Sequence, residues 1–222
     1  MEIGMPDLAL ESMIQRELVN RGITSQAVIE SFRRIPRPLF VPEYLQHQAM
    51  ADEDLPIGLG QTLSPPYVIA RMMQELQVTP ESRVLEIGTG SGFQTAMLSL
   101  MCKQVYTVEL LPELSARARR TLVENMGLRN ISLFVGDGTH GWSDKAPFDG
   151  IITNAAVEDI PPALIGQLRD GGRLVIPVNI EEEGQELHVV TRVGFDDEVT
   201  TIAAEEFCGR FRELEGDALD ED

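Results

Sequence analysis

The chain has 222 residues, of which 43% are hydrophobic and 24% are charged, as expected for a globular protein with one sizeable core. Its 18 basic and 36 acidic side chains give a net charge of −18, which repels phosphate backbones and anionic membranes and so argues against nucleic-acid and membrane partners. No apolar run reaches the length of a membrane span, and the first residues lack the basic-then-apolar pattern of a signal peptide, so we expect a cytoplasmic protein.

The first fifty residues predict mainly short helices. Apolar residues recur at helical spacing over residues 8–20, and a Ser/Thr pair caps a second predicted helix over 24–33. Three prolines within residues 35–42 predict an extended, non-helical strap, because proline restricts its own backbone and that of the residue before it. Residues 43–50 could form one more short helix.

Residues 52–66 have no helical or strand-like period. Residues such as Leu55, Ile57 and Leu63 nevertheless make this stretch apolar, and an apolar loop of such length inside a domain is usually functional or packed as a lid. We therefore expect an ordered loop here, followed by a helix over 67–76.

From residue 83 onward, strand-like runs alternate with helical runs, which predicts a doubly wound, mostly parallel sheet. After Pro177 the helices stop, and two β-rich runs around a Gly-Phe-Asp-Asp turn predict an antiparallel hairpin at one edge. The expected strands are 84–87, 105–108, 131–135, 150–153, 173–178, 186–193 and 199–207, and the expected helices are 94–101, 113–125 and 163–168.

These patterns predict an α/β fold in a single domain over residues 1–222. Within it we expect N-terminal helices and a binding loop over 1–80, a Rossmann-like core over 81–208, and an acidic tail over 209–222. The tail is interpreted as a solvated segment, because a run of like charges repels itself and stays in water.

The cysteines and histidines give no sign of a metal site. Cys102 and Cys208 lie far apart in the sequence, and the three histidines stand singly. Neither spacing is typical of metal ligands or of a disulfide framework. We therefore expect two reduced thiols and no metal.

The residues from Val84 to Gly92 (VLEIGTGSG) predict a buried strand, a tight turn and a helix start, where α/β enzymes hold nucleotide-like ligands. Gly88, Gly90 and Gly92 do not follow the G-x-G-x-x-G spacing of a dinucleotide site, because Phe93 stands where the third glycine of that motif belongs. No triphosphate-binding Gly-Lys-Ser/Thr is present either. This turn favours S-adenosylmethionine, which has no phosphate, over the alternative of a nicotinamide cofactor.

Three acids are expected at the ends of three successive strands. Glu86 could accept the ammonium group of S-adenosylmethionine, directly or through water. Glu109 lies about 20 residues past the glycine turn, where an acid that accepts ribose hydroxyls is expected. Asp137 would then lie near the adenine edge. Each acid alone could instead be a helix cap, but their joint placement suits a cationic, phosphate-free cofactor.

The sequence after the fourth expected strand argues against a nucleic-acid base as methyl acceptor. It reads Thr153-Asn154-Ala155-Ala156, without the prolines and the aromatic ring that hold a flipped base. A magnesium-assisted catechol reaction would need a carboxylate cluster. Asp149, Glu158 and Asp159 could supply one, but are better explained as surface caps.

Several motifs together resemble the protein-L-isoaspartate O-methyltransferase family. The glycine motif alone is common to many methyltransferases, whereas the Gly-Gln-Thr-x-Ser-x-Pro loop is specific to this family. The resemblance runs from about residue 10 to about residue 207. It is carried by residues 35–43, 55–66 (LPIGLGQTLSPP), 84–94 (VLEIGTGSGFQ), 135–142 (VGDGTHGW), 146–149 (APFD) and 171–177 (GGRLVIP).

The resemblance implies S-adenosylmethionine-dependent methylation of the free carboxylate of L-isoaspartyl residues in damaged proteins and peptides. Separately, we expect the chain to be a monomer. The ester then collapses to a succinimide, which reopens partly to normal aspartate. The resemblance further implies that Ser64 is the active-site residue. The resemblance and the features of the glycine turn and strand ends together give the predicted cofactor-binding residues. They are Thr62, Leu63, Ser64, Glu86, Gly88, Thr89, Gly90, Gly92, Glu109, Leu110, Asp137 and Gly138.

Two departures from the family pattern keep alternatives open. Position 65 is Pro where the family often has Gln, and residues 208–214 replace a final strand that ends aromatic-Val-Pro-Leu. The alternatives are a methyltransferase of the same fold that acts on another carboxylate or a small molecule, and a non-catalytic module that binds S-adenosylmethionine or isoaspartyl protein.

Overall fold

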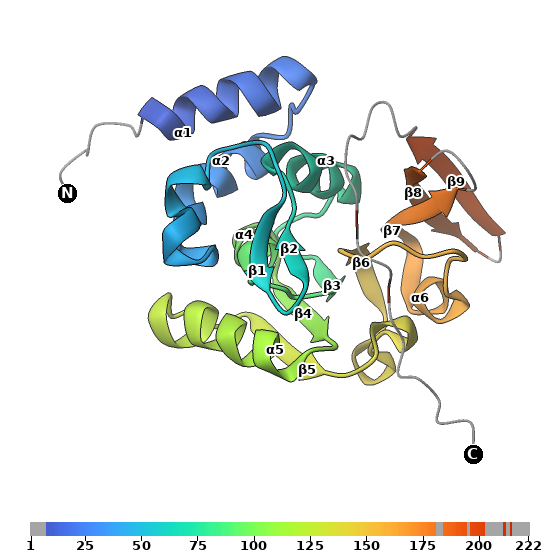
Figure 1. Cartoon of the computed structure of the whole chain (residues 1–222). Helices are drawn as coiled ribbons and strands as arrows, with labels where there is room; N and C mark the ends of the chain where they lie inside the picture. Colours follow the sequence, from blue (N-terminus) through green and yellow to red (C-terminus); the bar gives the residue numbers. More distant parts are fainter. Residues whose placement is uncertain (1–7, 181–183, 195, 203–210, 212–213, 215–222) are drawn as a thin grey trace.

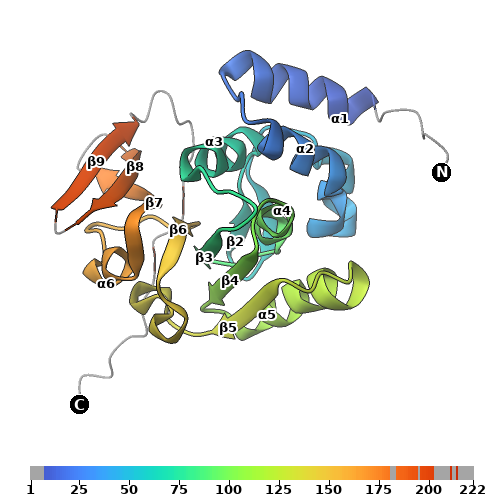
Figure 2. The same cartoon turned by 180° about the vertical axis from the view of Figure 1, so that it is seen from behind.

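The computed structural model describes residues 8–180, 184–194, 196–202, 211 and 214. A central sheet is covered by helices, and the N-terminal helices lie together at one side of it (Figures 1 and 2). Among these described residues, no helix combines the length and the apolar character that crossing a bilayer requires.

The sheet has seven strands in the order β5-β4-β3-β6-β7-β8-β9. The first five in this order run parallel, whereas β8 and β9 are antiparallel additions at the edge. This confirms the predicted mostly parallel sheet with a C-terminal hairpin. The strands are β3 (Arg83–Ile87), β4 (Gln104–Glu109), β5 (Ile131–Val135), β6 (Phe148–Thr153), β7 (Leu168–Ile180), β8 (Gly184–Val193) and β9 (Asp196–Ile202).

Four of the helices begin where the sequence supplies helix-start residues. Ser25 caps one of them by accepting a hydrogen bond from the Val28 N–H at 3.4 Å, and proline stands at the first turn of three others, where its missing N–H costs nothing. The helices are α2 (Gln26–Arg34), α3 (Pro66–Leu76), α4 (Phe93–Met101), α5 (Pro112–Arg119), which continues as a π-helical turn over Arg120–Asn125, and α6 (Pro162–Gly166).

The remaining helical segments are short. The predicted helix over 8–20 consists of α1 (Leu8–Met13), a π-helical turn (Ile14–Leu18) and a 3₁₀ turn (Val19–Arg21), and it ends at Gly22 with a positive φ of 90°. Further 3₁₀ turns span Glu43–Gln48, Gly138–His140 and Ser143–Lys145.

Three sequence-based expectations need correction. The strap over 35–42 contains a 3₁₀ turn at Arg37–Phe40, because proline is compatible with the first turn of a helix. The helix expected over 163–168 ends at Gly166, and Leu168 already begins β7. The strand expected over 199–207 begins at Asp196. Its residues beyond 202, like Cys208 and most of the acidic tail, lie outside the described residues.

The stretch over 52–66, expected to be a loop, contains a two-stranded antiparallel hairpin of β1 (Leu55–Gly58) and β2 (Gln61–Leu63). In β1, Leu55 and Ile57 are buried while the residues after each are exposed. That is the period of a strand with one buried face. This strand period is not recognised in the sequence because the exposed positions are Pro56 and Gly58, and these residue types seldom occur in strands.

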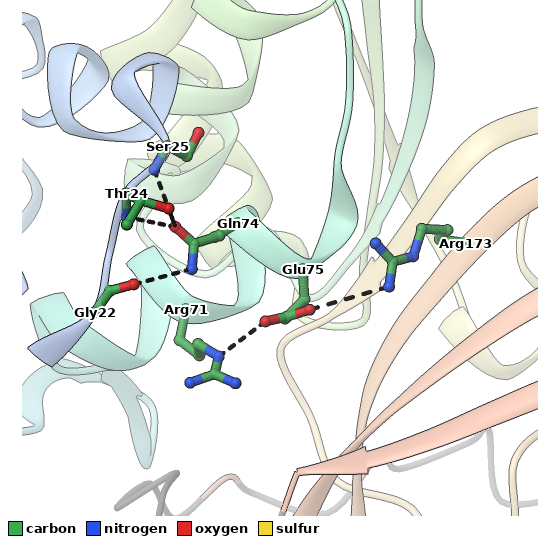
Figure 3. Close-up of polar contacts among 7 residues, drawn as sticks. All are labelled: Gly22, Thr24, Ser25, Arg71, Gln74, Glu75 and Arg173. Carbon is green, nitrogen blue, oxygen red and sulfur yellow. Dashed lines mark hydrogen bonds and ion pairs between the residues drawn. The ribbon is translucent and has the colours of Figure 1, made fainter.

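The N-terminal helices are fixed to the core by the side chain of Gln74 in α3 (Figure 3). Its Oε1 accepts hydrogen bonds from the backbone N–H groups of Thr24 (2.7 Å) and Ser25 (3.0 Å), and its Nε2 donates to the Gly22 carbonyl (3.3 Å). The amide of Gln74 therefore forms hydrogen bonds with three backbone groups in the turn that leads into α2.

The strands of the sheet alternate between two apolar cores. Val84 belongs to the core shared with α2, α3 and α4, whereas Leu85 and Ile87 belong to the core on the opposite face. Because side chains alternate along a strand, Glu86 points to the same face as Val84 and is buried beneath α4. This placement decides its role in the site.

Candidate active site

A cavity of about 630 Å³ opens at the carboxyl ends of β3, β4 and β6. The strand order changes direction between β3 and β6. After β3 the chain adds β4 and β5 on one side, and it then returns to add β6 and β7 on the other side. Ligands of open α/β sheets bind at such a point. The hairpin β1–β2 supplies a further wall of the cavity, and Figure 1 draws it beside β3 and β4.

Nine of the twelve predicted cofactor-binding residues line this cavity. Three come from the end of the hairpin, three from the glycine turn, and three from the last residue of β4 and the segments that follow β4 and β5. They are Thr62, Leu63 and Ser64; Gly88, Thr89 and Gly90; and Glu109, Leu110 and Gly138.

The glycines of the turn are required by the backbone and by close packing. Gly88, Gly90 and Gly92 have φ values of 85°, 55° and 88°, a region that other residues rarely adopt. A Cβ on Gly92 would lie 3.0 Å from Leu122 Cδ1. Gly92 therefore packs against α5 and its π-helical continuation, and it is not part of the cavity lining.

Glu109 holds the glycine turn against the end of β4. Its Oε2 accepts a hydrogen bond from the Gly90 N–H at 2.7 Å, and its Oε1 accepts one from the Leu111 N–H at 3.0 Å. The carboxylate is nearly buried and lines the cavity. It is therefore fixed in orientation before any ligand binds.

Glu86 does not line the cavity, which corrects the expectation that it receives a ligand directly. Its side chain is fully buried and accepts hydrogen bonds from Thr95 Oγ1 (2.5 Å) and Thr107 Oγ1 (2.7 Å), and from the amides of Gln94 (3.3 Å) and Asn154 (3.4 Å). Burial raises the pKa of Glu86 to about 7, although these four donors oppose the shift.

Asp137 serves as a cap in the described structure. Its carboxylate accepts a hydrogen bond from the Thr139 N–H at 2.7 Å and lies 3.6 Å from His140 Nε2. The next residue, Gly138, lines the cavity and packs so closely that an added Cβ would lie 2.2 Å from Ile87 Cγ2. Asp137 thus shapes the turn that brings Gly138 to the cavity.

Ser64 is anchored through its backbone by a buried arginine. Arg37 Nη2 donates to the Ser64 carbonyl at 2.8 Å, and Arg37 Nε donates to the Ala49 carbonyl at 2.8 Å. The guanidinium carbon also lies 5.0 Å from the centre of the Phe93 ring. Burial lowers the pKa of Arg37 to about 9, so the group stays charged at neutral pH.

The tip of the hairpin is held over the cavity from the opposite side. Arg117 of α5 donates from Nη1 to the Ile57 carbonyl at 2.8 Å. Leu59 at the tip has a positive φ of 54° and lines the cavity with half of its surface exposed. The hairpin is therefore fastened both at Ile57 and at Ser64.

Several residues that line the cavity were not predicted from the sequence. Asn154 follows β6, where its Nδ2 donates to the Gly88 carbonyl at 2.9 Å. Ser91 and Gln94 belong to the turn and to α4. Their position within the glycine motif was the signal that could have found them.

Two described residues near the C-terminus also reach the cavity. Phe211 and Leu214 line it, and the Leu214 N–H donates to the Ala156 carbonyl at 2.7 Å. Gln185 of β8 holds Phe211 by donating to its carbonyl (2.9 Å) and accepting from its N–H (2.6 Å). Two residues of the stretch that departs from the family's usual ending therefore lie at this wall.

The wall of the cavity fits a cationic ligand with hydrogen-bonding groups and no phosphate. Ser91 Oγ and Gln94 Oε1 are buried there without a partner, and Glu109 contributes a negative charge. Within the described ranges, no three metal-ligating side chains come together. Asp149, which we expected to be a surface cap and not a magnesium ligand, accepts a hydrogen bond from the Arg83 N–H and pairs with Arg169.

This sheet, with its glycine turn and an acid at the end of the neighbouring strand, defines a class I S-adenosylmethionine-dependent methyltransferase. The sequence model described as "Protein-L-isoaspartate(D-aspartate) O-methyltransferase (PCMT)" matches residues 9–208. The chain therefore belongs to the protein-L-isoaspartate O-methyltransferase family, which confirms the resemblance noted in the sequence.

Individual relatives agree with this membership. The chain is 46% identical to protein-L-isoaspartate O-methyltransferase 1 of Anaeromyxobacter sp. (strain Fw109-5), over 83% of this chain and 87% of that protein. It is 50% identical to the protein-L-isoaspartate O-methyltransferase of Myxococcus xanthus, over 79% of this chain and 82% of that protein.

Solved structures show the same fold. One protein-L-isoaspartate O-methyltransferase superposes with a TM-score of 0.81 at 24% identity, over 96% of this chain and 66% of that chain. A putative relative from Plasmodium falciparum, solved in complex with S-adenosyl-L-homocysteine, superposes with a TM-score of 0.73 at 21% identity, over 93% and 96% of the two chains.

Proposed function

We propose that this cavity binds S-adenosylmethionine and directs methylation of the free carboxylate of L-isoaspartyl residues in damaged proteins and peptides. The methyl ester then collapses to a succinimide, which initiates repair. The family membership over residues 9–208 supports the reaction. The observation that carries the assignment to this site is Ser64, which lines the same cavity as the glycine turn and is anchored through its carbonyl by Arg37.

The proposed methyl transfer requires the protein mainly to align the acceptor carboxylate with the methyl donor. A carboxylate has an ordinary pKa near 4, so the acceptor is already an anion at neutral pH and needs no general base. The bound cofactor supplies an electrophilic methyl group on a sulfonium. A new carbon–oxygen bond forms as the carbon–sulfur bond breaks, which leaves a neutral thioether, and the site contributes mainly by proximity and orientation.

We propose roles for the residues of the cavity on this basis. The Ser64 hydroxyl donates a hydrogen bond that orients the acceptor carboxylate, since bonds to a charged acceptor are the stronger ones. Thr62, Leu63 and the glycine turn border the cofactor, and Glu109 with Leu110 binds its ribose. Gly138 lies beside the adenine.

Matched peptides test the proposal directly. Labelled S-adenosylmethionine should transfer its methyl group to a peptide containing L-isoaspartate and not to the same peptide containing L-aspartate. Equal methylation of both peptides would contradict the substrate assignment. Activity on other carboxylates alone would favour a different acceptor, and cofactor binding without turnover on any acceptor would favour a binding module.

We also propose that the whole chain acts as one domain, as a monomer, in the cytoplasm and without nucleic-acid substrates. The net charge of −18 supports the last point, because it repels phosphate backbones. The free, buried Cys102 supports a reducing compartment. Light scattering on the purified protein tests the monomer, and a mass of twice 24.6 kDa would contradict it.

A further inference from the structure

Asn154, the residue after β6, has an unpaired hydrogen-bond acceptor at the cavity. The residue lines the cavity and is only partly buried. Its side-chain nitrogen is occupied, since Nδ2 donates to the Gly88 carbonyl at 2.9 Å and to Glu86 Oε1 at 3.4 Å. Its Oδ1 has no partner among the described residues, and it is not one of the unpaired polar atoms that are closed off from solvent. The oxygen is therefore open to a donor on a ligand.

The orientation of the Asn154 amide is fixed before any ligand binds. The Gly88 carbonyl can only accept a hydrogen bond, so the NH₂ group must face it and the oxygen must point away. The Asn154 backbone N–H also donates to the Ile87 carbonyl at 2.8 Å. A Cβ on Gly88 would lie 3.3 Å from Asn154 Cβ, so the side chain packs closely against the glycine turn. The acceptor is thus held in one orientation.

Ser64 approaches the cavity at the same end of β6 as Asn154. Helix α3 begins two residues after Ser64 and packs against β6 and β7. Its last residue, Leu76, lies over the first half of β6, because a Cβ on Gly150 would be 3.0 Å from Leu76 Cδ1. The start of α3 is therefore directed toward the end of β6. Ser64 and Asn154 line the cavity there from the helix and from the strand.

Asn154 also lies beyond the residues proposed to bind the nucleoside part of the cofactor. Along the strand order β5-β4-β3-β6, Gly138 follows β5, Glu109 ends β4, and the glycine turn follows β3. The proposed adenine and ribose sites therefore lie on one side of the glycine turn. Asn154 lies on the other side, where the acceptor of the methyl group has to be.

We propose that Asn154 Oδ1 accepts a hydrogen bond from the backbone N–H of the isoaspartyl residue while the Ser64 hydroxyl donates one to its carboxylate, an inference that rests on the proposed function. In an isoaspartyl residue, one carbon carries both the free carboxylate and the N–H. In an aspartyl residue, a further carbon–carbon bond of about 1.5 Å separates them, which is more than the length of a hydrogen bond tolerates. Asn154 and Ser64 together therefore distinguish isoaspartate from aspartate.

A peptide in which an ester oxygen replaces this N–H tests the contact. The ester peptide keeps the carboxylate and the chain length but has no donor for Asn154. For the wild-type protein, kcat/KM should be about 3- to 10-fold lower for the ester than for the isoaspartyl peptide, the size of one neutral hydrogen bond. Asn154→Leu keeps a similar shape without the acceptor and should methylate both peptides with equal kcat/KM. Because both peptides use the same cofactor, any effect of the variant on cofactor binding cancels in this comparison.

Two further variants complete the comparison. Asn154→Ala removes the same acceptor with a smaller side chain and should also abolish the difference between the peptides. Asn130→Leu is the matched control, because Asn130 Nδ2 also donates to backbone carbonyls, those of Ser99 (2.8 Å) and Cys102 (3.1 Å), but Asn130 does not line the cavity. This variant should keep the wild-type preference for the isoaspartyl peptide over the ester.

Equal kcat/KM for the two peptides in the wild-type protein would overturn the role of Asn154. A preference that persists in Asn154→Leu and Asn154→Ala, or that is lost in Asn130→Leu as well, would also overturn it. These results would leave the proposed function intact, because the wild-type protein would still methylate the isoaspartyl peptide. Failure of the wild-type protein to methylate that peptide would instead overturn the proposed function, and this inference with it.

Discussion

Arg37 and Ser64 are joined by a 2.8 Å hydrogen bond from the arginine Nη2 to the serine carbonyl, although 27 residues separate them in the chain. The arginine is only 1% exposed. Its second hydrogen bond, to the Ala49 carbonyl, ties the segments before and after the hairpin to one rigid group. The position of Ser64 over the cavity therefore depends on a residue that does not itself line it.

Replacing Arg37 by Lys should disturb the reaction more than cofactor binding. Lysine keeps the positive charge but lacks the planar fork that reaches two carbonyls. We expect kcat for an isoaspartyl peptide to fall about tenfold or more, with stability reduced by roughly 1–3 kcal/mol because a buried carbonyl loses its donor. Arg33→Lys is the control, since Arg33 forms an exposed ion pair with Glu11 and should change stability by less than about 0.5 kcal/mol.

Ser64→Ala removes the hydroxyl and leaves the backbone contact with Arg37 intact. If the hydroxyl orients the acceptor carboxylate, kcat should fall by about 10- to 100-fold, as expected for a hydrogen bond to a charged group. Cofactor affinity measured by calorimetry should change little. Unchanged kcat would show that Ser64 is a turn residue only.

Glu109→Gln tests the acid that binds the glycine turn. Both carboxylate oxygens accept backbone N–H groups, from Gly90 and Leu111, whereas an amide has only one oxygen to accept them. We expect S-adenosylhomocysteine to bind about tenfold more weakly or worse. Glu113→Gln, an exposed residue in the first turn of α5, should leave the affinity unchanged.

Glu86 should make the protein less stable as the pH rises. Its pKa is raised from 4.5 to about 7 in the folded state, so the unfolded chain loses this proton first as the pH increases. Stability should therefore fall between about pH 4.5 and pH 7 by an amount on the order of 3 kcal/mol, and then level off.

The matched variant for this effect is Glu86→Gln, which carries no proton to lose. Urea unfolding at pH 5 and pH 7.5 should show a smaller drop in the free energy of unfolding for Glu86→Gln than for wild type. The exposed Glu81→Gln should show the same drop as wild type. Identical drops in all three proteins would contradict the raised pKa of Glu86.

Gly138→Ala should destabilise the protein at the cavity wall. Its Cβ would lie 2.2 Å from Ile87 Cγ2, and such overpacking typically costs about 1–3 kcal/mol. Gly166→Ala is the control, because nothing lies within 4 Å of its Cβ position and Gly166 is the last residue of α6, so stability should be unchanged or slightly higher. A thermal melt of both variants makes the comparison, and equal melting temperatures would argue against the contact with Ile87.

The sequence by itself determined the alternating strands and helices, the glycine turn and the acids at the strand ends. These features are local, because apolar periodicity and glycine's access to positive φ depend on neighbours in the chain. The parallel sheet followed from the alternation, and the family loop identified the reaction. The hairpin at Leu55–Leu63 was missed because Pro56 and Gly58 obscure its period.

Only the tertiary structure decided which of these residues face the cavity. Glu86 stands in the same motif as Gly88, yet the alternation of side chains along β3 buries it under α4 and leaves Gln94 at the wall. Arg37 and Gln185 meet their partners, Ser64 and Phe211, across 27 and 26 residues. Such pairings depend on how distant segments pack, which local sequence patterns do not encode.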